Sequence, residues 1–341
     1  MVAPERIDTA GTLAWSRELV EPALRAAVDT LPGSMRRISG YHLGWWDEHG
    51  TRVPASSGKA VRPTLTLLSA AVTGGSPGDA VPAGVAVELV HNFSLLHDDV
   101  MDGDLTRRHR PTAWSVFGIG GAILAGDAML TLALDVLAAS GHPAAEASMR
   151  MLNAAVQELV EGQCADMDFE RRSTVAVAEC QAMAAGKTAA LMGAACAIGG
   201  AFAGASPERI GHLRAFGEHI GLAFQHVDDL LGIWGDERTT GKPVYSDVRN
   251  RKKSLPVVYV LTSGTAAGDE LAGLYGREAP PTGQDLPRAA DLVAQAGGRA
   301  WSQSQADHLV SEALTHLEAL PSTAAAAELT ALAHLLTHRT H

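Results

Sequence analysis

The sequence predicts an all-α protein. Strand signals are scarce, and long Ala- and Leu-rich segments dominate, punctuated by Pro and Gly. The chain has 341 residues, of which 46% are hydrophobic and 5% aromatic. That apolar fraction is typical of a globular protein rather than a disordered one. We expect a single domain over residues 1–341, with a loosely attached portion after about residue 264.

In the first half of the chain, turn residues separate the expected helices. Gly33 follows the first helix, Gly74–Gly75 separates the second from the third, and Gly141-His142-Pro143 separates the fourth from the fifth. The segment 41–58 is expected to be a loop whose Trp45 and Trp46 cover an edge of the core. The expected helices are 12–31, 59–73, 81–101, 122–139 and 143–168.

In the second half, Ser206-Pro207 is a helix-start signal and the segment 276–287 is a Gly- and Pro-rich loop. The intervening segments are apolar and free of breakers, which favours helices. The expected helices are 176–203, 207–234, 253–263, 286–296, 300–319 and 322–338.

Charge and cysteine content narrow the class of protein. The formal net charge of −11 disfavours nonspecific nucleic-acid binding. The cysteines at 164, 180 and 196 form no C-x-x-C pair, so we expect a reducing compartment and three small core residues. The N-terminus has no signal-peptide pattern, and the charge-free stretch 188–207 is too rich in Ala and Gly to favour lipid. The prediction is a cytoplasmic protein without stable membrane insertion.

The first acidic motif reads D-D-x-x-D. Asp98 and Asp102 are four residues apart, so both carboxylates lie on one helix face, and His91 lies on the same stripe. Two such carboxylates repel by about 3 kcal/mol at an effective dielectric of 20, and a divalent cation removes that cost. An exposed acidic helix end is the simpler interpretation, but the preceding segment is too apolar for a solvated face.

The second acidic motif is thinner. Asp228 and Asp229 follow another apolar run, and Gly232 stands one turn after Asp228. Asp236 returns to the face of Asp229 if the helix continues, and Gln225, one turn before Asp229, can bind ligand or metal-bound water. Two acidic motifs on buried helices indicate a site for several metal ions and a phosphorylated ligand.

Basic residues follow both acidic motifs. A lone Lys187 in an apolar helix is costly unless it pairs with an anion. A solvated basic turn or a nucleic-acid patch would also explain the run 249–253. Cations after both motifs instead suit a diphosphate held between metal ions and Arg or Lys. The candidates are Lys59, Arg62, Arg107, Arg108, Arg110, Lys187, Lys242, Arg249, Arg251, Lys252 and Lys253.

The ordered motifs GKAVRP, HDDVMD, RRHRPT, ILAGDA, GKT, FQHVDD and GKPVYSD–RKKSLP cover about 58–256. With this set the chain resembles the trans-isoprenyl diphosphate synthases, or polyprenyl synthetases, and most of all a short-chain geranylgeranyl diphosphate synthase. The resemblance implies a helical bundle around a central cavity, usually a homodimer, with three Mg²⁺ ions per active site. The implied reaction joins an allylic diphosphate head to tail to isopentenyl diphosphate.

The resemblance also implies roles for individual residues. Asp98, Asp99 and Asp102 would hold Mg²⁺ on the allylic diphosphate, and Asp228, Asp229 and Asp236 would bind a further Mg²⁺. The allylic diphosphate would contact Arg107, Lys187, Lys242 and Lys252. Thr188 and Gln225 would lie near the reacting carbon, and Lys59, Arg62, His91 and Arg108 would bind isopentenyl diphosphate.

Three positions depart from the family pattern. Gly232 replaces the last Asp of the second motif, His109 stands where Gly commonly follows the Arg pair, and Ala60 replaces a basic residue. Product length in this family depends on large residues four or five positions before the first Asp. Phe93 with Ser94 resembles the arrangement for a C20 product, geranylgeranyl diphosphate, and farnesyl diphosphate is the alternative.

Other classes explain the sequence less well. A class I terpene cyclase needs no isopentenyl diphosphate site, and its second metal motif is typically an Asn/Ser/Glu pattern. A helical metal phosphohydrolase requires further His and Asp ligands, and that class does not account for the second acidic helix. A non-catalytic subunit of a heteromeric prenyl synthase usually lacks Asp-motif residues, whereas the first motif here is complete.

Overall fold

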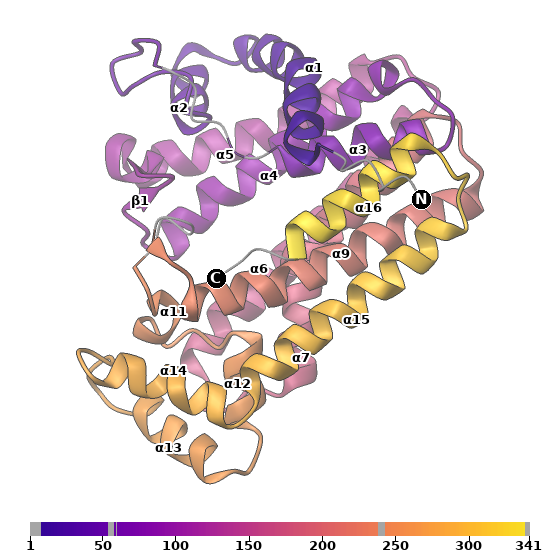
Figure 1. The fold of residues 1–341 in the computed structure, drawn as a ribbon. Coiled ribbons are helices and arrows are strands. Elements are labelled where there is room, and N and C mark those ends of the chain that lie inside the picture. Colours follow the sequence, from indigo (N-terminus) through magenta and orange to yellow (C-terminus); the bar gives the residue numbers. More distant parts are fainter. Residues whose placement is uncertain (1–7, 54–57, 59, 238–242, 338–341) are drawn as a thin grey trace. The chain divides into compact units, whose positions relative to one another are not determined.

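The fold was analysed in a computed structural model, which describes residues 8–53, 58, 60–237 and 243–337. Its regular elements within these ranges are helices, apart from one short hairpin and one isolated bridge between Trp46 and Arg52 (Figure 1). The predicted all-α class is therefore confirmed.

The chain forms two compact units, each built from segments distant in sequence. Unit 1 comprises residues 1–154, 194–214 and 318–331. Unit 2 comprises residues 155–193, 215–317 and 332–341. The single domain expected over 1–341 stays a prediction.

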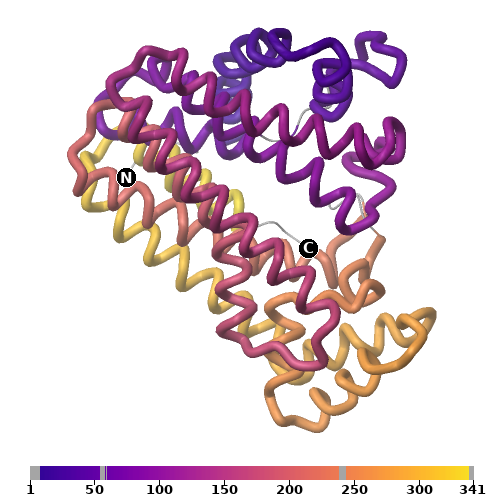
Figure 2. The backbone as a smooth tube through the Cα atoms, turned by 180° about the vertical axis from the view of Figure 1, so that it is seen from behind, coloured from indigo at the N-terminus to yellow at the C-terminus, as the bar shows by residue number. Residues whose placement is uncertain are grey.

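The apolar helix α4 is central to unit 1. It packs against α3 and α5, and α4 and α5 lie side by side in both views (Figures 1 and 2). Leu89 and Leu96 of α4 are fully buried, as the apolar sequence before the first acidic motif predicts. The N-terminal elements are α1 (Thr9–Asp29), α2 (Gly33–His42), α3 (Val61–Val72), η1 (Pro77–Ala80), α4 (Val81–Met101), β1 (Thr106–Arg107), β2 (Arg110–Pro111) and α5 (Ala113–Ala139).

The middle of the chain is a series of long helices interrupted by one π-helical turn. That turn, η2, holds Lys187 and Thr188. π-Turns inside helices occur often at functional sites. The elements are α6 (Ala145–Arg171), α7 (Val177–Ala184), η2 (Ala185–Ala189), α8 (Ala190–Phe202) and α9 (Pro207–Trp234).

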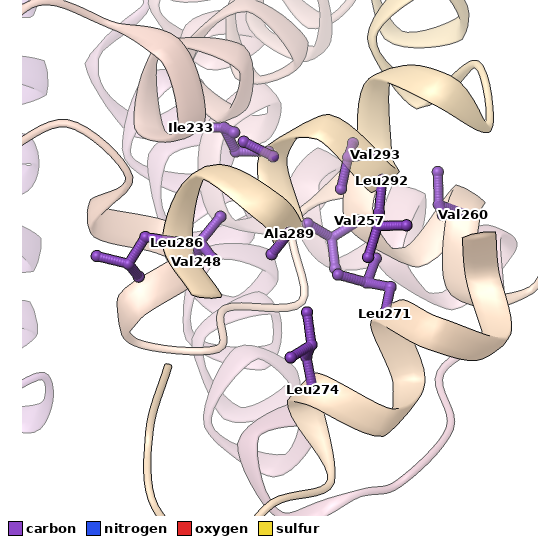
Figure 3. Packing of buried hydrophobic residues seen from close by; sticks show 11 residues of the cluster. Ile233, Val248, Val257, Val260, Leu271, Leu274, Leu286, Ala289, Leu292 and Val293 are labelled. Carbon is purple, nitrogen blue, oxygen red and sulfur yellow. The ribbon is translucent and has the colours of Figure 1, made fainter. Parts of the chain in front are cut away.

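The C-terminal helices of unit 2 share a core with the end of α9. Ile233 of α9 packs in one cluster with Val257, Leu271 and Leu292 (Figure 3). The portion after residue 264 is therefore not loosely attached, because its apolar faces complete this core. The elements are α11 (Ser246–Arg249), α12 (Leu255–Leu261), α13 (Ala266–Tyr275), α14 (Asp285–Gln295), α15 (Gly298–Glu318) and α16 (Ala324–Thr337).

Some expected features were wrong. Helices α2 and α13 are absent from the expected set. For α2 the reason is Gly33, which suggests a break in the sequence but begins a helix after Pro32. Helix α5 starts at Ala113 rather than 122 and accommodates the glycine-rich stretch by a kink at Gly118, whose φ is 80°. Cys180 and Cys196 are buried as expected, but Cys164 is exposed.

Two described helices are long and apolar enough to cross a membrane, Ala113–Ala139 and Val177–Phe202. Length and composition alone are weak evidence, because core helices pass the same test. The second helix is mostly buried, at 72% of its most apolar window, as a core helix would be. A cytoplasmic location without stable membrane insertion stays a prediction.

Candidate active site

The first acidic motif occupies the end of α4 in unit 1. The Asp102 amide donates to the Asp98 carbonyl over 2.8 Å, so the last helical turn continues to Asp102. The Asp98 and Asp102 side chains are therefore one turn apart on the same face. Asp98 is partly buried and Asp102 is exposed.

Asp99 lies on the inner side of this motif. Its Oδ1 accepts a hydrogen bond from Arg107 Nε over 2.7 Å, and its Oδ2 is buried without a hydrogen-bond partner among the described residues. Burial raises the pKa of Asp99 to about 6, although the Arg107 guanidinium opposes this shift. Asp99 therefore anchors the arginine that follows the motif.

Arg107 is held by the β1–β2 hairpin, in which it pairs with Arg110. The two turn residues, Arg108 and His109, have φ of 51° and 59°. A two-residue hairpin turn with both φ values positive favours Gly or Asn, because other side chains crowd the backbone there. His109 is thus in a left-handed conformation at the position where the family commonly has Gly.

The residues expected to bind isopentenyl diphosphate converge on a partly buried acid, Glu88. Arg62 Nη1 lies 3.3 Å from His91 Nε2, and Asn92 Nδ2 donates to Glu88 Oε1 over 3.0 Å. Burial raises the pKa of Glu88, whereas Asn92, Arg62 and Arg108 lower it. Sequence reasoning missed Glu88, which faces the cations one turn before Asn92.

Two histidines beside these arginines are neutral. Burial, together with Arg62 and Arg108, holds the pKa of His91 well below its ordinary value. Burial also lowers the pKa of His42 to about 3, with Arg108 as the next cause. The positive charge of this cluster therefore comes from its arginines. The expected partner Lys59 lies outside the described residues.

The second acidic motif, in unit 2, likewise combines one buried aspartate (inner) with one exposed aspartate (outer). Asp228 is exposed and Asp229 is buried. Asp229 accepts hydrogen bonds from Gln225 Nε2 over 2.7 Å and from the Leu255 amide over 2.8 Å. Thr188 Oγ1 donates to Gln225 Oε1 over 2.6 Å. Gln225 thus links Thr188 to Asp229, and its contact with a ligand stays a prediction.

Asp229 is close to half-protonated at neutral pH. Burial, followed by the nearby carboxylate of Asp247, raises its pKa to about 7, against the lowering effect of Leu255 and Gln225. A carboxylate with this pKa is costly to ionise unless cations approach it.

Asp247 also lies next to Gly232. A Cβ built on Gly232 would lie 2.1 Å from Asp247 Oδ2, so the Asp247 carboxylate fills the space of a side chain there. Helix α9 ends at Trp234, so Asp236 is not one of its helical residues, and the role of Asp236 as a metal ligand stays a prediction. Sequence reasoning missed Asp247, although it is the last residue of the GKPVYSD motif.

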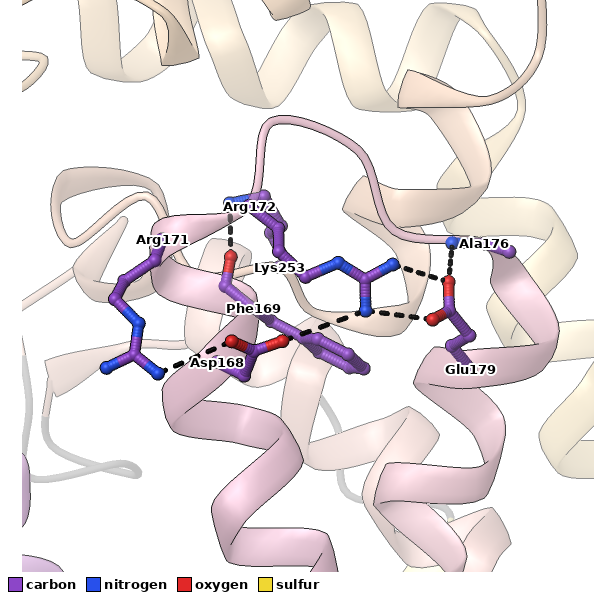
Figure 4. Close-up of polar contacts among 7 residues, drawn as sticks. All are labelled: Asp168, Phe169, Arg171, Arg172, Ala176, Glu179 and Lys253. Atoms are coloured by element: carbon purple, nitrogen blue, oxygen red, sulfur yellow. Dashed lines mark hydrogen bonds and ion pairs between the residues drawn. The ribbon is translucent and has the colours of Figure 1, made fainter.

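The cations of unit 2 have different partners. Lys187 Nζ contacts Asp166 Oδ2 over 2.6 Å. Lys253 Nζ instead donates to the Phe169 carbonyl at the end of α6, over 2.6 Å (Figure 4). Lys253 therefore caps a helix, whereas its neighbour Lys252 lies close enough to Asp166 to lower the pKa of that acid. Lys242 lies outside the described residues.

Other ion pairs near the end of α6 are structural. Arg172 joins Asp168 and Glu179, and Glu179 also accepts from the Ala176 amide at the start of α7 (Figure 4). These contacts fix the α6–α7 connection. Among the described residues, no three His, Cys, Asp or Glu side chains are grouped so that they could hold a metal ion by themselves.

Comparison with known proteins defines the class of this helical enzyme. The chain is 47% identical over 336 residues to a (2E,6E)-farnesyl diphosphate synthase of Mycobacterium bovis, covering 97% of this chain and 93% of that protein. It is 46% identical over 319 residues to a geranylgeranyl diphosphate synthase of Mycobacterium tuberculosis, covering 93% and 90%. A polyprenyl synthetase structure from Streptomyces coelicolor A3(2) has a TM-score of 0.93 at 45% identity, covering 96% of this chain and 99% of that one. These relatives are prenyltransferases.

The family model described as Polyprenyl synthetase matches residues 45–293. The chain belongs to the polyprenyl synthetase family, and it is a prenyltransferase that elongates prenyl chains head to tail. The family resemblance of the sequence is thereby confirmed, and the cyclase and phosphohydrolase alternatives fall away.

We predict that Asp229 makes the stability of the metal-free protein depend on pH. The unfolded chain loses this proton near pH 3.8, whereas the folded chain keeps it to about pH 7. Between these values the folded state binds more protons, so the contribution of Asp229 to stability falls as pH rises. Asp229→Asn removes that contribution.

The measurement is denaturant unfolding of wild type and variant between pH 3.8 and about pH 7, the window that the two pKa values of Asp229 define. The unfolding free energy of Asp229→Asn should fall less steeply with pH than that of wild type. Asp228→Asn, at the exposed neighbour, is the matched control and should keep the wild-type slope. Parallel curves for Asp229→Asn and wild type would contradict the assignment.

Proposed function

We propose that the chain catalyses the Mg²⁺-dependent condensation of isopentenyl diphosphate with an allylic diphosphate to give geranylgeranyl diphosphate (C20). The observation that carries this proposal is the division of both acidic motifs into a buried inner Asp and a more accessible outer Asp. Membership of a family that elongates prenyl chains supports it independently.

The outer carboxylates suit Mg²⁺. Mg²⁺ takes one or two protein carboxylates and completes its octahedron with substrate phosphates and water, so a group of three protein ligands is not needed. Asp98 and Asp102 present two carboxylates on one helical turn, and Asp228 is exposed. We assign the metal ions, three per active site, to these residues. Asp99 and Asp229 then position their protein partners, and Asp236, just after the end of α9, stays a candidate ligand for the further Mg²⁺.

The basic residues bind the two diphosphates. Arg107 and Lys187 each pair with a carboxylate that fixes the cation in place, and Lys252 is close to the partner of Lys187. These three, together with Lys242, would hold the allylic diphosphate. Arg62, His91 and Arg108, together with Lys59, would hold isopentenyl diphosphate, with His91 as a neutral hydrogen-bonding group.

The chemistry fits these residue types. Breaking the allylic C–O bond places negative charge on the departing diphosphate, and bound Mg²⁺ supplies compensating positive charge. Arg107, Lys187 and Lys252 stabilise the same charge from fixed positions. Thr188 and Gln225 would lie beside the reacting carbon, and the 2.6 Å hydrogen bond between them fixes their side chains. The apolar helices exclude water from the allylic cation until the isopentenyl double bond attacks it, and the released diphosphate then accepts the proton that the product loses.

Product length is proposed from Phe93. Its side chain is buried in α4 and packs edge-on against His97, with ring centroids 4.8 Å apart. Ser94 is small and donates to the His91 carbonyl. A single aromatic residue at position 93, with none at position 94, would close the end of the cavity at a depth that supports a C20 product. The relative named as a farnesyl diphosphate synthase, at 47% identity, favours farnesyl diphosphate (C15) as the second candidate.

The test is an incubation of purified protein with Mg²⁺, labelled isopentenyl diphosphate and the C5, C10 or C15 primer in turn. The proposal expects elongation to C20, and none after chelation of the metal. Product that stops at C15 would favour farnesyl diphosphate. Failure to elongate any primer would contradict the proposal and would favour a non-catalytic subunit.

We predict that Phe93→Ala lengthens the product beyond that of wild type by at least one C5 unit, because it deepens the cavity in which the chain grows. Chromatography of the dephosphorylated products measures this. Phe202→Ala is the control, since Phe202 is equally buried but stacks on His142, away from the acidic motif in sequence. An unchanged product from Phe93→Ala would remove Phe93 as the floor.

The proposed oligomer is a homodimer. Helix α5 exposes large apolar side chains, among them Ile119 (55%), Ile123 (38%) and Leu124 (57%). An exposed apolar face of this kind marks an interaction surface, and a second copy of the chain is the occupant that the family resemblance implies.

We predict that Leu124→Glu converts the dimer to a monomer, because it places a charge in the apolar interface. Light scattering coupled to size-exclusion chromatography measures the mass. Leu335→Glu, at another exposed leucine, should leave the dimer intact. A wild-type protein that is monomeric at assay concentration would contradict the proposal.

A further inference from the structure

We propose that Asp166 is a positioning residue that holds Lys187 where it meets the departing diphosphate. The proposal rests on the proposed function, which assigns Lys187 to the allylic diphosphate. It identifies the residue through which α6 contributes to the reaction.

The contact between the two residues is direct and shielded. Lys187 Nζ lies 2.6 Å from Asp166 Oδ2, and the two side chains are only 19% and 13% exposed. A hydrogen bond between ionised partners is among the stronger ones in proteins, and shielding from water reduces its screening. Asp166 therefore restricts the long lysine side chain to one direction.

Close packing of the α6 backbone against the π-turn brings Asp166 and Lys187 together. A Cβ on Gly162 of α6 would lie 2.5 Å from the Lys187 amide nitrogen, and a Cβ on Gly186 would lie 2.6 Å from the Glu158 carbonyl oxygen. Only glycines permit so close an approach of α6 to the π-turn. Glu158, Gly162 and Asp166 are spaced four residues apart, so Asp166 lies on the α6 face that contacts the π-turn.

A second lysine shares the same carboxylate. The charges of Lys252 and Lys187, with the hydrogen bond from Lys187, lower the pKa of Asp166 despite its burial. Asp166 is thus ionised at neutral pH and lies near two cations. Without it, the lysines would repel each other and Lys187 would lose its fixed direction.

The consequence for the reaction is specific. A lysine held in place stabilises the charge that develops as the C–O bond breaks, without reorganising during the step. Loss of Asp166 should therefore lower kcat. The same loss removes a negative charge near the bound diphosphate, so KM for the allylic substrate should not rise.

The experiment is a double-mutant cycle of Asp166→Asn and Lys187→Gln, with kcat and KM measured for the allylic substrate. Asp166→Asn should lower kcat on the order of 10-fold, the scale of one charge-assisted hydrogen bond, and leave KM within about 3-fold. In the Lys187→Gln background the same substitution should change kcat less than about 2-fold, because its effect passes through Lys187.

Control variants separate positioning from folding. Asp168→Asn removes an exposed, ion-paired carboxylate of the same helix and should keep the wild-type kcat. Asp166→Glu keeps the charge and should retain more activity than Asp166→Asn. If Asp166→Asn melts well below wild type, the comparison of Asp166→Glu with Lys187→Gln carries the test: Asp166→Glu should keep the larger kcat, and an equal loss in both would overturn the inference.

The outcomes distinguish the inference from the proposed function. Wild-type kcat in Asp166→Asn, or the same 10-fold loss in the Lys187→Gln background, would overturn the positioning role alone. A wild-type protein that elongates no primer, or a Lys187→Gln variant with full activity, would instead overturn the assignment on which the inference depends.

Discussion

An ionised carboxylate is stable inside a protein only with partners, and this constraint shapes both acidic motifs. Arg107 donates to Oδ1 of Asp99, whose Oδ2 is buried without a partner among the described residues, and Gln225 and the Leu255 amide donate to Asp229. Each motif therefore commits one aspartate to the protein and leaves another more accessible. In each motif, one aspartate binds protein groups and the other is available to a ligand.

The same requirement organises the cations. Arg107 pairs with Asp99, Lys187 with Asp166, and the partly buried Glu88 compensates Arg62. A cation that has a fixed carboxylate partner is oriented before substrate arrives, which reduces the reorganisation needed when charge develops on a leaving diphosphate. Lys253 shows the contrast, because its Nζ donates to the Phe169 carbonyl and caps α6.

The sequence predicted local features well and tertiary pairings poorly. The boundaries of α4 and α9 agree with the expected 81–101 and 207–234, because each is a long apolar run with a clear start. The start of α5 was missed because glycines in its first turns resemble a loop. Asp166 pairs with Lys187, 21 residues away, and Asp247 lies against Gly232 on another helix, so neither motif spacing nor periodicity reveals them. Gly232 was interpreted as a lost ligand, although Asp247 occupies its side-chain space.

The central claim is that the outer aspartates carry the metal ions while the inner aspartates keep their protein partners. Anomalous diffraction from crystals grown with Mn²⁺ and inorganic diphosphate tests it most directly. We expect metal peaks within bonding distance of Asp98, Asp102 and Asp228, with the Asp99–Arg107 and Asp229–Leu255 hydrogen bonds intact. Metal bound instead to Asp99 or Asp229, with those hydrogen bonds broken, would contradict it.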